Sequence, residues 1–218
     1  MNTRSLLFVA LASSVAAFGQ VNQVQDGPFQ IRYASNLAVG ESVINFTNSG
    51  ASSTQAFNAN FAANGEICAN VYAYSPDEQL VSCCSCNVTP NALNSLSVKA
   101  DLGTNTLTPI IPSSLVIKVI ATAGGTACTA SSAALAGTPP NVISQGLLAW
   151  GTTIHALPDL PGSPATTYGV TETAFSNAFL SPAEQFRMTQ LCTFIRANGS
   201  GFGICKSCKV GGLGASSK

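Results

Sequence analysis

The sequence predicts a mainly β protein, an Ig-like or jelly-roll-type β-sandwich with one C-terminal α-helix and a cysteine-containing, glycine-rich tail. Three observations support this fold class. Apolar and polar residues alternate in many short runs, which is the pattern of strands with one buried face. Turn residues separate these runs at spacings of about 8 to 12 residues, as is typical of all-β sandwiches. A stripe of apolar residues with helical spacing then follows residue 181.

The first strand is expected at residues 29–33, where three apolar side chains alternate with Gln30 and Arg32. The same alternation predicts a strand at residues 57–61. Further strands are expected at residues 42–47, 67–74, 80–86, 93–98, 115–122, 142–150 and 168–175. Nothing in the pattern specifies closure into a barrel, so we favour a sandwich.

Turn signals separate most of these strands, for example Asn-Ser-Gly at residues 48–50 and Ser-Pro-Asp-Glu at residues 75–78. Two stretches rich in small residues, glycine and proline predict long loops at residues 124–141 and 156–167. Loops of this length are uncommon inside a compact domain and are often functional. Both are therefore candidate binding edges.

A C-terminal helix is expected to begin after Ser181. Ser181 is a suitable N-cap, Pro182 suits the first helical position, and Glu184 completes the pattern of a capping box. The stripe that should face the protein consists of Met188, Leu191, Cys192 and Ile195. Gly199 can adopt the left-handed conformation that ends a helix, and a glycine-rich hook follows it.

The N-terminus has the layout of a secretory signal peptide at residues 1–19. Cleavage is expected after Gly19, with cleavage after Ala16 as the alternative. A β-sandwich domain is then expected at residues 20–180, and the helix with a disulfide-stapled tail at residues 181–218. The apolar run near the N-terminus is shorter than a membrane-spanning helix needs. The mature chain is therefore expected to be exported, without a membrane span.

The charge of the chain excludes several classes of function. Charged residues make up 8% of the sequence, against about 25% in ordinary soluble domains, and nine basic side chains balance nine acidic ones. No basic patch for nucleic acid is expected from this balance. Serine, threonine and asparagine together exceed a quarter of the sequence, so uncharged side chains supply the polar surface. A net charge near zero favours self-association, because copies repel one another weakly.

The eight cysteines predict disulfides, because their number is even and the chain is expected to be exported. They are Cys68, Cys83, Cys84, Cys86, Cys128, Cys192, Cys205 and Cys208. Since side chains alternate along a strand, Cys84 and Cys86 should share one face and Cys83 should lie on the other. The turn at residues 75–78 folds the two neighbouring strands together, so Cys68 is expected to pair with Cys84 or Cys83.

The glycine-rich hook returns the tail toward the helix. Cys192 is therefore expected to pair with Cys205 or Cys208, which would staple the tail and contribute about 3 kcal/mol in the chain-entropy model. Cys128 is left for Cys83, Cys86 or the remaining cysteine of the tail.

Redox and metal chemistry are weaker interpretations of the same cysteines. Cys205 and Cys208 have the spacing of a dithiol motif, but such a motif begins a helix beside a βαβ unit, and this one follows a helix. A zinc site could use Cys84, Cys86, Cys205 and Cys208, yet only one residue separates the first two of these sulfurs, unlike a zinc knuckle. We therefore expect no metal and no cofactor.

The sequence contains no recognisable catalytic set. His155 is its one histidine, with Asp159 close by, so a Ser-His-Asp arrangement assembled in space stays open. However, the G-x-S-x-G motif of a nucleophile elbow is absent. Glu172 is notable as a carboxylate within an otherwise uncharged expected strand. The sequence leaves the roles of His155 and Glu172 open, and we assign no catalytic residue.

Aromatic side chains are the candidates for ligand contacts. Tyr72, Tyr74, Trp150 and Tyr168 lie on expected strands and would bind a ligand if they were exposed. Packing in the core is the alternative for each of them.

Two segments carry a resemblance to known proteins. Residues 192–208, which end in NGSGFGICKSC, and residues 75–86, SPDEQLVSCCSC, together resemble an uncharacterised group of secreted, cysteine-containing bacterial proteins. The resemblance implies export and a cysteine-dependent fold. No activity is attached to it.

These features favour an exported, non-enzymatic structural or adhesive β-sandwich protein stabilised by disulfides. It is expected outside the cell or on the cell surface, with the periplasm as an alternative. Its expected partners are other copies of itself or components of the cell surface and extracellular matrix, and not nucleic acid. The alternative function is an extracellular ligand- or carbohydrate-binding module, and a third is a secreted hydrolase or a thiol-redox or metal protein.

Overall fold

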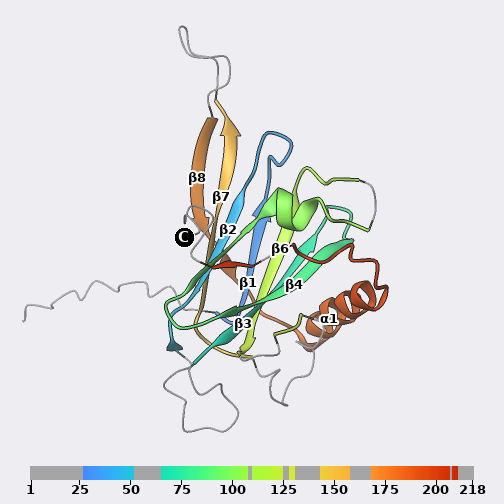
Figure 1. The fold of residues 1–218 in the computed structure, drawn as a ribbon. Coiled ribbons are helices and arrows are strands. Elements are labelled where there is room, and N and C mark those ends of the chain that lie inside the picture. Colours follow the sequence, from blue (N-terminus) through green and yellow to red (C-terminus); the bar gives the residue numbers. More distant parts are fainter. Residues whose placement is uncertain are drawn as a thin grey trace, which may run out of the picture.

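The computed structural model describes residues 27–51, 65–107, 110–124, 128–130, 143–157, 168–206 and 208–210. The expected signal peptide at residues 1–19, the expected strand at 57–61 and most of the two expected long loops lie outside these residues. Within the described residues the chain is mainly β. It has two five-stranded antiparallel sheets, a short π-helical turn η2 (Val98–Gly103) and one C-terminal α-helix. Figure 1 shows the C-terminal helix beside the sheets.

The first sheet has the strand order β4-β3-β6-β1-β9. Its strands are β1 (Phe29–Ala34), β3 (Ile67–Tyr74), β4 (Leu80–Val88), β6 (Leu115–Ala123) and β9 (Ser176–Asn177). The second sheet has the order β10-β5-β2-β7-β8. Its strands are β2 (Val43–Asn48), β5 (Leu93–Ser97), β7 (Leu147–Ala156), β8 (Tyr168–Ala174) and β10 (Lys209–Val210).

Most of the expected strands that the structure describes are confirmed, with ends within a few residues of those expected. The exception is the strand expected at residues 142–150, which begins only at Leu147 and continues to Ala156. Gly146 precedes it with a φ of 110°, which interrupts the extended backbone. The strands β9 and β10 were not expected, because two residues carry no periodicity.

One buried cluster contains residues of both sheets. Ile44, Phe46 and Leu96 come from the second sheet, and Val71 and Ile117 come from the first. Burial of such side chains is the main favourable term in folding, at about 25 cal/mol per Å² of apolar surface. The two sheets therefore share a core.

A second buried cluster lies on the opposite face of the first sheet, where helix α1 (Pro182–Ala197) packs. Tyr72 of β3 contributes to it, whereas its neighbour Val71 belongs to the core between the sheets. Strand β3 is consequently buried along its whole length. The layers follow in the order second sheet, first sheet, helix.

Helix α1 begins and ends where the sequence predicts. The Oγ of Ser181 accepts a hydrogen bond from the backbone N–H of Glu184 at 3.1 Å, and Pro182 begins the helix. The carboxylate of Glu184 contacts Lys118 and Arg187. Gly199 follows the helix with a φ of 66°. The expected cap is therefore confirmed at Ser181, while Glu184 ties the helix to the first sheet.

The hairpin of β7 and β8 extends beyond the second sheet (Figure 1). Strand β2 pairs with β7 over residues 147–151, whereas β8 pairs with β7 over residues 150–156. The far halves of β7 and β8 therefore form a two-stranded ribbon. The side chain of Asn36 braces it by donating a hydrogen bond to the carbonyl of Ile154 at 3.0 Å.

Candidate functional site

The eight cysteines form four disulfides, and no described cysteine is free. The pairs are Cys68–Cys128, Cys83–Cys192, Cys84–Cys205 and Cys86–Cys208. Disulfides of this number are typical of oxidising compartments, extracellular or periplasmic. The expected sharing of faces is confirmed, because Cys84 and Cys86 lie in the core between the sheets while Cys83 lies in the cluster under α1.

The expected pairing of Cys68 with Cys84 or Cys83 is wrong. In the register of β3 and β4, Cys68 lies opposite Asn87, which is three residues beyond Cys84. The segment after β6 instead brings Cys128 back over β3. Cys128 was expected to pair with Cys83, Cys86 or a cysteine of the tail, and that expectation is wrong for the same reason.

The expected pairing of Cys192 with Cys205 or Cys208 is also wrong. Helix α1 packs against β4, so its inward-facing Cys192 meets Cys83. The tail then takes its two cysteines to the other face of β4, where each pairs with a different partner. Cys205 and Cys208 pair with Cys84 and Cys86, so they do not form the disulfide between the two cysteines of a C-x-x-C motif that redox proteins use.

The tail crosses from one sheet to the other. The N–H of Cys83 on β4 donates to the carbonyl of Gly203 at 2.9 Å, and Asn105 holds the hook by donating to the carbonyl of Ile204 at 2.8 Å. A few residues later, β10 pairs with β5. The tail thus pairs with β4 at Cys83 and with β5 at Asn94 and Ser95, and it occupies part of the outer edge of each strand, where backbone groups would otherwise be available to other chains.

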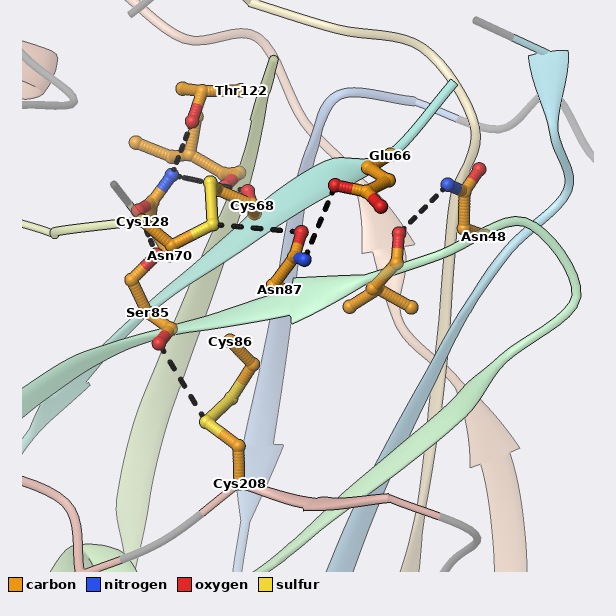
Figure 2. Close-up of a disulfide and its surroundings, with 12 residues drawn as sticks. Asn48, Glu66, Cys68, Asn70, Ser85, Cys86, Asn87, Thr122, Cys128 and Cys208 are labelled. Carbon is orange, nitrogen blue, oxygen red and sulfur yellow. Dashed lines mark hydrogen bonds between the residues drawn. A yellow bond between two sulfur atoms is a disulfide. The ribbon is translucent and has the colours of Figure 1, made fainter. Parts of the chain in front are cut away.

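Buried amides connect the strands beside the disulfides, as Figure 2 shows. Asn70 donates to the carbonyl of Ile120 at 3.0 Å and to the hydroxyl of Thr122 at 2.9 Å, and it accepts from Ser85 at 2.7 Å. Asn48 donates to the carbonyl of Val88 at 3.0 Å. The hydrogen-bonding capacity of these amides is used within the protein, so they stabilise the fold.

Two of the four candidate aromatic residues are buried, which contradicts the expectation of exposed ligand contacts at these positions. Tyr72 donates to the carbonyl of Ala130 at 2.6 Å beneath α1. Tyr74 lies beside the cations of Lys118 and Arg187, at 5.1 and 5.7 Å from its ring centre. Burial raises the pKa of Tyr74 to about 12, with Arg187 opposing the shift. Both rings pack in the core.

A charged group fastens α1 over these tyrosines. Glu184 accepts hydrogen bonds from Lys118 of β6 and from Arg187, the latter at 3.2 Å. Burial alone would raise the pKa of the Glu184 carboxyl, but these two cations outweigh it and lower the pKa. The carboxylate is therefore charged near neutral pH and acts as a bridge between helix and sheet.

The other two candidate aromatic residues lie on one face of the second sheet. Trp150 is partly exposed and Tyr168 is 45% exposed. Strand registers place both on the face away from the core, because Trp150 lies opposite Asn45 and Ala174 while Tyr168 lies opposite Ala156. The side chains of Ile154 and Val170 lie between them on the same face.

His155 and Glu172 lie on opposite faces of the ribbon. The Nε2 of His155 is 2.8 Å from the hydroxyl of Thr171, on the face that continues the core side. Glu172 lies opposite Thr152 on the other face. Asp159 lies outside the described residues. The ribbon therefore does not combine His155 and Glu172 into an acid–base pair.

Sequence reasoning missed Arg32, which was expected on the polar side of β1. The side chain is buried and donates to the carbonyl of Thr173 and the hydroxyl of Thr153, both at 2.8 Å. Burial lowers the pKa of Arg32, and the charge of Glu172 opposes this shift. Gln30 likewise donates to the carbonyl of Leu147 at 2.7 Å. These two side chains bind the first sheet to the hairpin of the second, and only a tertiary structure could reveal that.

Two surface grooves lie near the turn between β3 and β4. One, of about 370 Å³, is lined by this turn and by residues 110–113. The other, of about 400 Å³, lies beside α1 and is lined by Glu78, Gln79, Leu80, Leu107, Arg187, Leu191, Phe194 and Ile195. Among the described residues there is no group of three potential metal ligands and no helix long and apolar enough to cross a membrane.

Comparison with protein-family models, curated proteins and solved structures finds no match to this chain.

Proposed function

We propose that this protein is an exported, non-enzymatic structural or adhesive component that acts through the exposed ribbon of β7 and β8. The observation that carries the proposal is the ribbon itself, which extends beyond the disulfide-linked part of the structure and presents apolar side chains to solvent. In the ribbon, Val170 is 64% exposed and Tyr168 is 45% exposed, on one face of a two-stranded segment that extends beyond the second sheet. Exposed apolar side chains grouped in this way mark interaction sites.

The two sheets are proposed to form an Ig-like or jelly-roll-type sandwich. Their shared core and antiparallel pairing support this finer assignment. Four disulfides would allow such a scaffold to persist outside the cytoplasm, where a protein meets proteases and dilution. Among the described residues β8 is the outermost strand of the second sheet, and an edge strand of this kind can pair with another chain.

The test is a double substitution on the ribbon, Tyr168→Ser with Val170→Thr, in the full-length chain expressed by its own secretion route. The wild-type protein is expected to co-sediment with the cell-envelope or matrix fraction, and the variant to appear in the soluble fraction. Ile110→Thr is the matched control, since Ile110 is exposed but lies outside the ribbon. Wild-type protein found wholly in the soluble fraction would contradict the proposal.

A second candidate function is carbohydrate binding on the outer face of the second sheet. The observation that favours it is the surroundings of Trp150. Its cross-strand neighbour is Asn45, and the next row along the face contains Thr152 and Glu172. A flat aromatic ring with amide, hydroxyl and carboxylate neighbours provides one apolar surface and several hydrogen-bonding groups, as a sugar ring requires.

A glycan panel tests this second candidate. Binding that is lost in Trp150→Ala and kept in Tyr33→Ala would support it, because Tyr33 is an exposed aromatic residue on the other sheet. A panel without any binding would contradict it and leave the structural function as the remaining proposal.

A further inference from the structure

Helix α1 has an apolar face on its outer side as well as on its inner side. The inner face is formed by Met188, Cys192 and Ile195. With 3.6 residues per turn, the opposite side of the helix carries a second set of residues, all of them exposed. These are Ala183, Phe186, Gln190, Phe194 and Ala197, which we call the outer face of α1.

The outer face is unusually apolar for a surface of this protein. Phe186 is 61% exposed and Phe194 is 69% exposed, and no residue of the face is charged. Phe179 just before the helix is 90% exposed, and Phe202 just after it is 52% exposed. A helix that lies on a protein surface normally presents polar side chains to water.

The residue types of the outer face have the same order from either end of the helix. Its residues are separated by three, four, four and three positions, and their order is Ala, Phe, Gln, Phe, Ala. The sequence of the face is therefore symmetric about Gln190. A two-fold interface requires a self-complementary surface in which residue i meets residue j and residue j meets residue i.

We propose that the outer face of α1 binds the same face of a second copy, with the two helices antiparallel and crossing at Gln190. Phe186 of each copy then packs against Phe194 of the other, and Ala183 against Ala197. The alanines allow the helices to approach closely at both ends. The amides of the two Gln190 side chains can donate to and accept from each other.

The available area agrees with a dimer. A phenylalanine side chain buries about 150–250 Å², so Phe186 and Phe194 of the outer face leave on the order of 250 Å² of phenyl surface in water, and Phe179 and Phe202 next to the two ends of the helix add a similar area. A stable interface takes about 800 Å² from each partner. The remaining residues of the outer face and the apolar groove of about 400 Å³ that Phe194 borders supply further surface. The chain carries no net charge, so two copies do not repel strongly.

This inference goes beyond the proposed function and does not depend on it, because α1 and the outer face of the second sheet lie on opposite sides of the layered structure. A dimer through α1 would leave both ribbons free. Two ribbons on one particle would increase its avidity for a repetitive surface.

The test combines a crosslink with a charge substitution in the mature chain. Gln190→Cys is expected to give a disulfide-linked dimer on a non-reducing gel, while Arg196→Cys, exposed on another side of the helix, is not. In sedimentation, wild-type protein is expected to dimerise at micromolar concentration, and Phe186→Glu with Phe194→Glu to weaken dimerisation at least tenfold. Val170→Glu on the ribbon is the control and should still dimerise.

Each other outcome overturns the inference. A dimer that survives the double glutamate substitution but is lost in Val170→Glu would assign self-association to the ribbon, which keeps the proposed function and rejects the α1 interface. A wild-type protein that stays monomeric at 100 times that concentration would reject the α1 dimer outright. If that monomer binds vesicles of neutral phospholipid, the outer face of α1 is a lipid-binding surface instead.

Discussion

Tyr72 and Tyr74 are two neighbouring tyrosines on the same face of β3 that differ in how their hydroxyl groups are used. Tyr72 donates to the carbonyl of Ala130, whereas the buried hydroxyl of Tyr74 has no hydrogen-bond partner among the described residues. Tyr72→Phe is expected to lower the free energy of unfolding by about 1 kcal/mol, because it leaves a buried carbonyl unpaired. Tyr74→Phe is expected to cost nothing or to stabilise slightly. Urea denaturation at pH 7 compares the two, and equal losses would contradict the assignment.

Tyr74 also predicts how stability changes in alkali. An unfolded tyrosine ionises near its ordinary pKa of 10.0, but burial raises the pKa of Tyr74 in the fold to about 12. Between these values the unfolded chain gives up a proton that the folded chain keeps, so the folded state loses stability as pH rises. This contribution is fully present below pH 10. Urea denaturation between pH 9 and pH 12 should show a shallower decline in Tyr74→Phe, and an unchanged slope would refute it.

For single residues, the sequence could name candidates but could not show which of them are buried. It indicated Tyr72, Tyr74, Trp150 and Tyr168 equally, since each lies on an expected strand. Only the position of α1 separates the two tyrosines that it covers from the two aromatic residues on the second sheet. Arg32 could not be recognised as buried, because its partners are more than a hundred residues away in the sequence.

At the scale of elements, the glycine hook after α1 has two kinds of glycine. Gly199 and Gly203 both have positive φ, but a Cβ on Gly199 would meet nothing within 4 Å, while one on Gly203 would lie 2.6 Å from Cγ2 of Ile195. Gly199→Ala is therefore expected to cost about 1–2 kcal/mol for the left-handed backbone alone. Gly203→Ala should cost at least about 1 kcal/mol more, because it also disturbs the packed core.

Thermal and urea unfolding of the two variants tests this difference. A similar cost at both positions would mean that the hook does not pack on α1 as described. The double variant is expected to be additive only in part, since both glycines belong to the same short hook.

The sequence predicted the elements well where periodicity or capping is strong. The strand β3 and the helix from Pro182 are located as expected, because alternation and the Ser181 cap are local signals. The alternation of β1 was read correctly as a strand, but its polar residues Gln30 and Arg32 face the second sheet and are buried. Which face of a strand is covered depends on the tertiary structure and leaves no local signal.

At the scale of the whole molecule, the disulfides constrain the unfolded chain unequally. Cys68–Cys128 closes a loop of 60 residues by itself. Cys84–Cys205 spans 121 residues, but the neighbouring pairs Cys83–Cys192 and Cys86–Cys208 already hold the same two segments together. The additional loop that Cys84–Cys205 closes is then only a few residues long.

Removal of the disulfide with the smaller sequence separation, Cys68–Cys128, should therefore lower the free energy of unfolding more than removal of Cys84–Cys205. In the chain-entropy model, Cys68→Ala with Cys128→Ala is expected to lower the free energy of unfolding by about 4 kcal/mol, and Cys84→Ala with Cys205→Ala by about 2 kcal/mol. Urea denaturation under non-reducing conditions measures both. A larger loss of stability on removal of Cys84–Cys205 would show that the other two disulfides of β4 do not already hold the C-terminal segment in place.

The connectivity itself could not be derived from the sequence. Eight cysteines allow 105 pairings, and strand alternation only separates Cys83 from Cys84 and Cys86. The correct choice depends on helix α1 lying against β4 and on the tail crossing to the second sheet. Both are long-range contacts that no local pattern encodes.

The measurement that tests the disulfide connectivity most directly is mass-spectrometric disulfide mapping of protein purified without reductant from the cells or medium that produce it and alkylated before digestion. Cleavage after Glu78 separates Cys68 from the cysteines of β4, and cleavage after Lys206 separates Cys205 from Cys208. The account predicts no alkylated cysteine, a peptide of Cys68 linked only to that of Cys128, and the β4 peptide linked to those of Cys192, Cys205 and Cys208. Free thiols in the tail, or a link from Cys128 to β4, would contradict it.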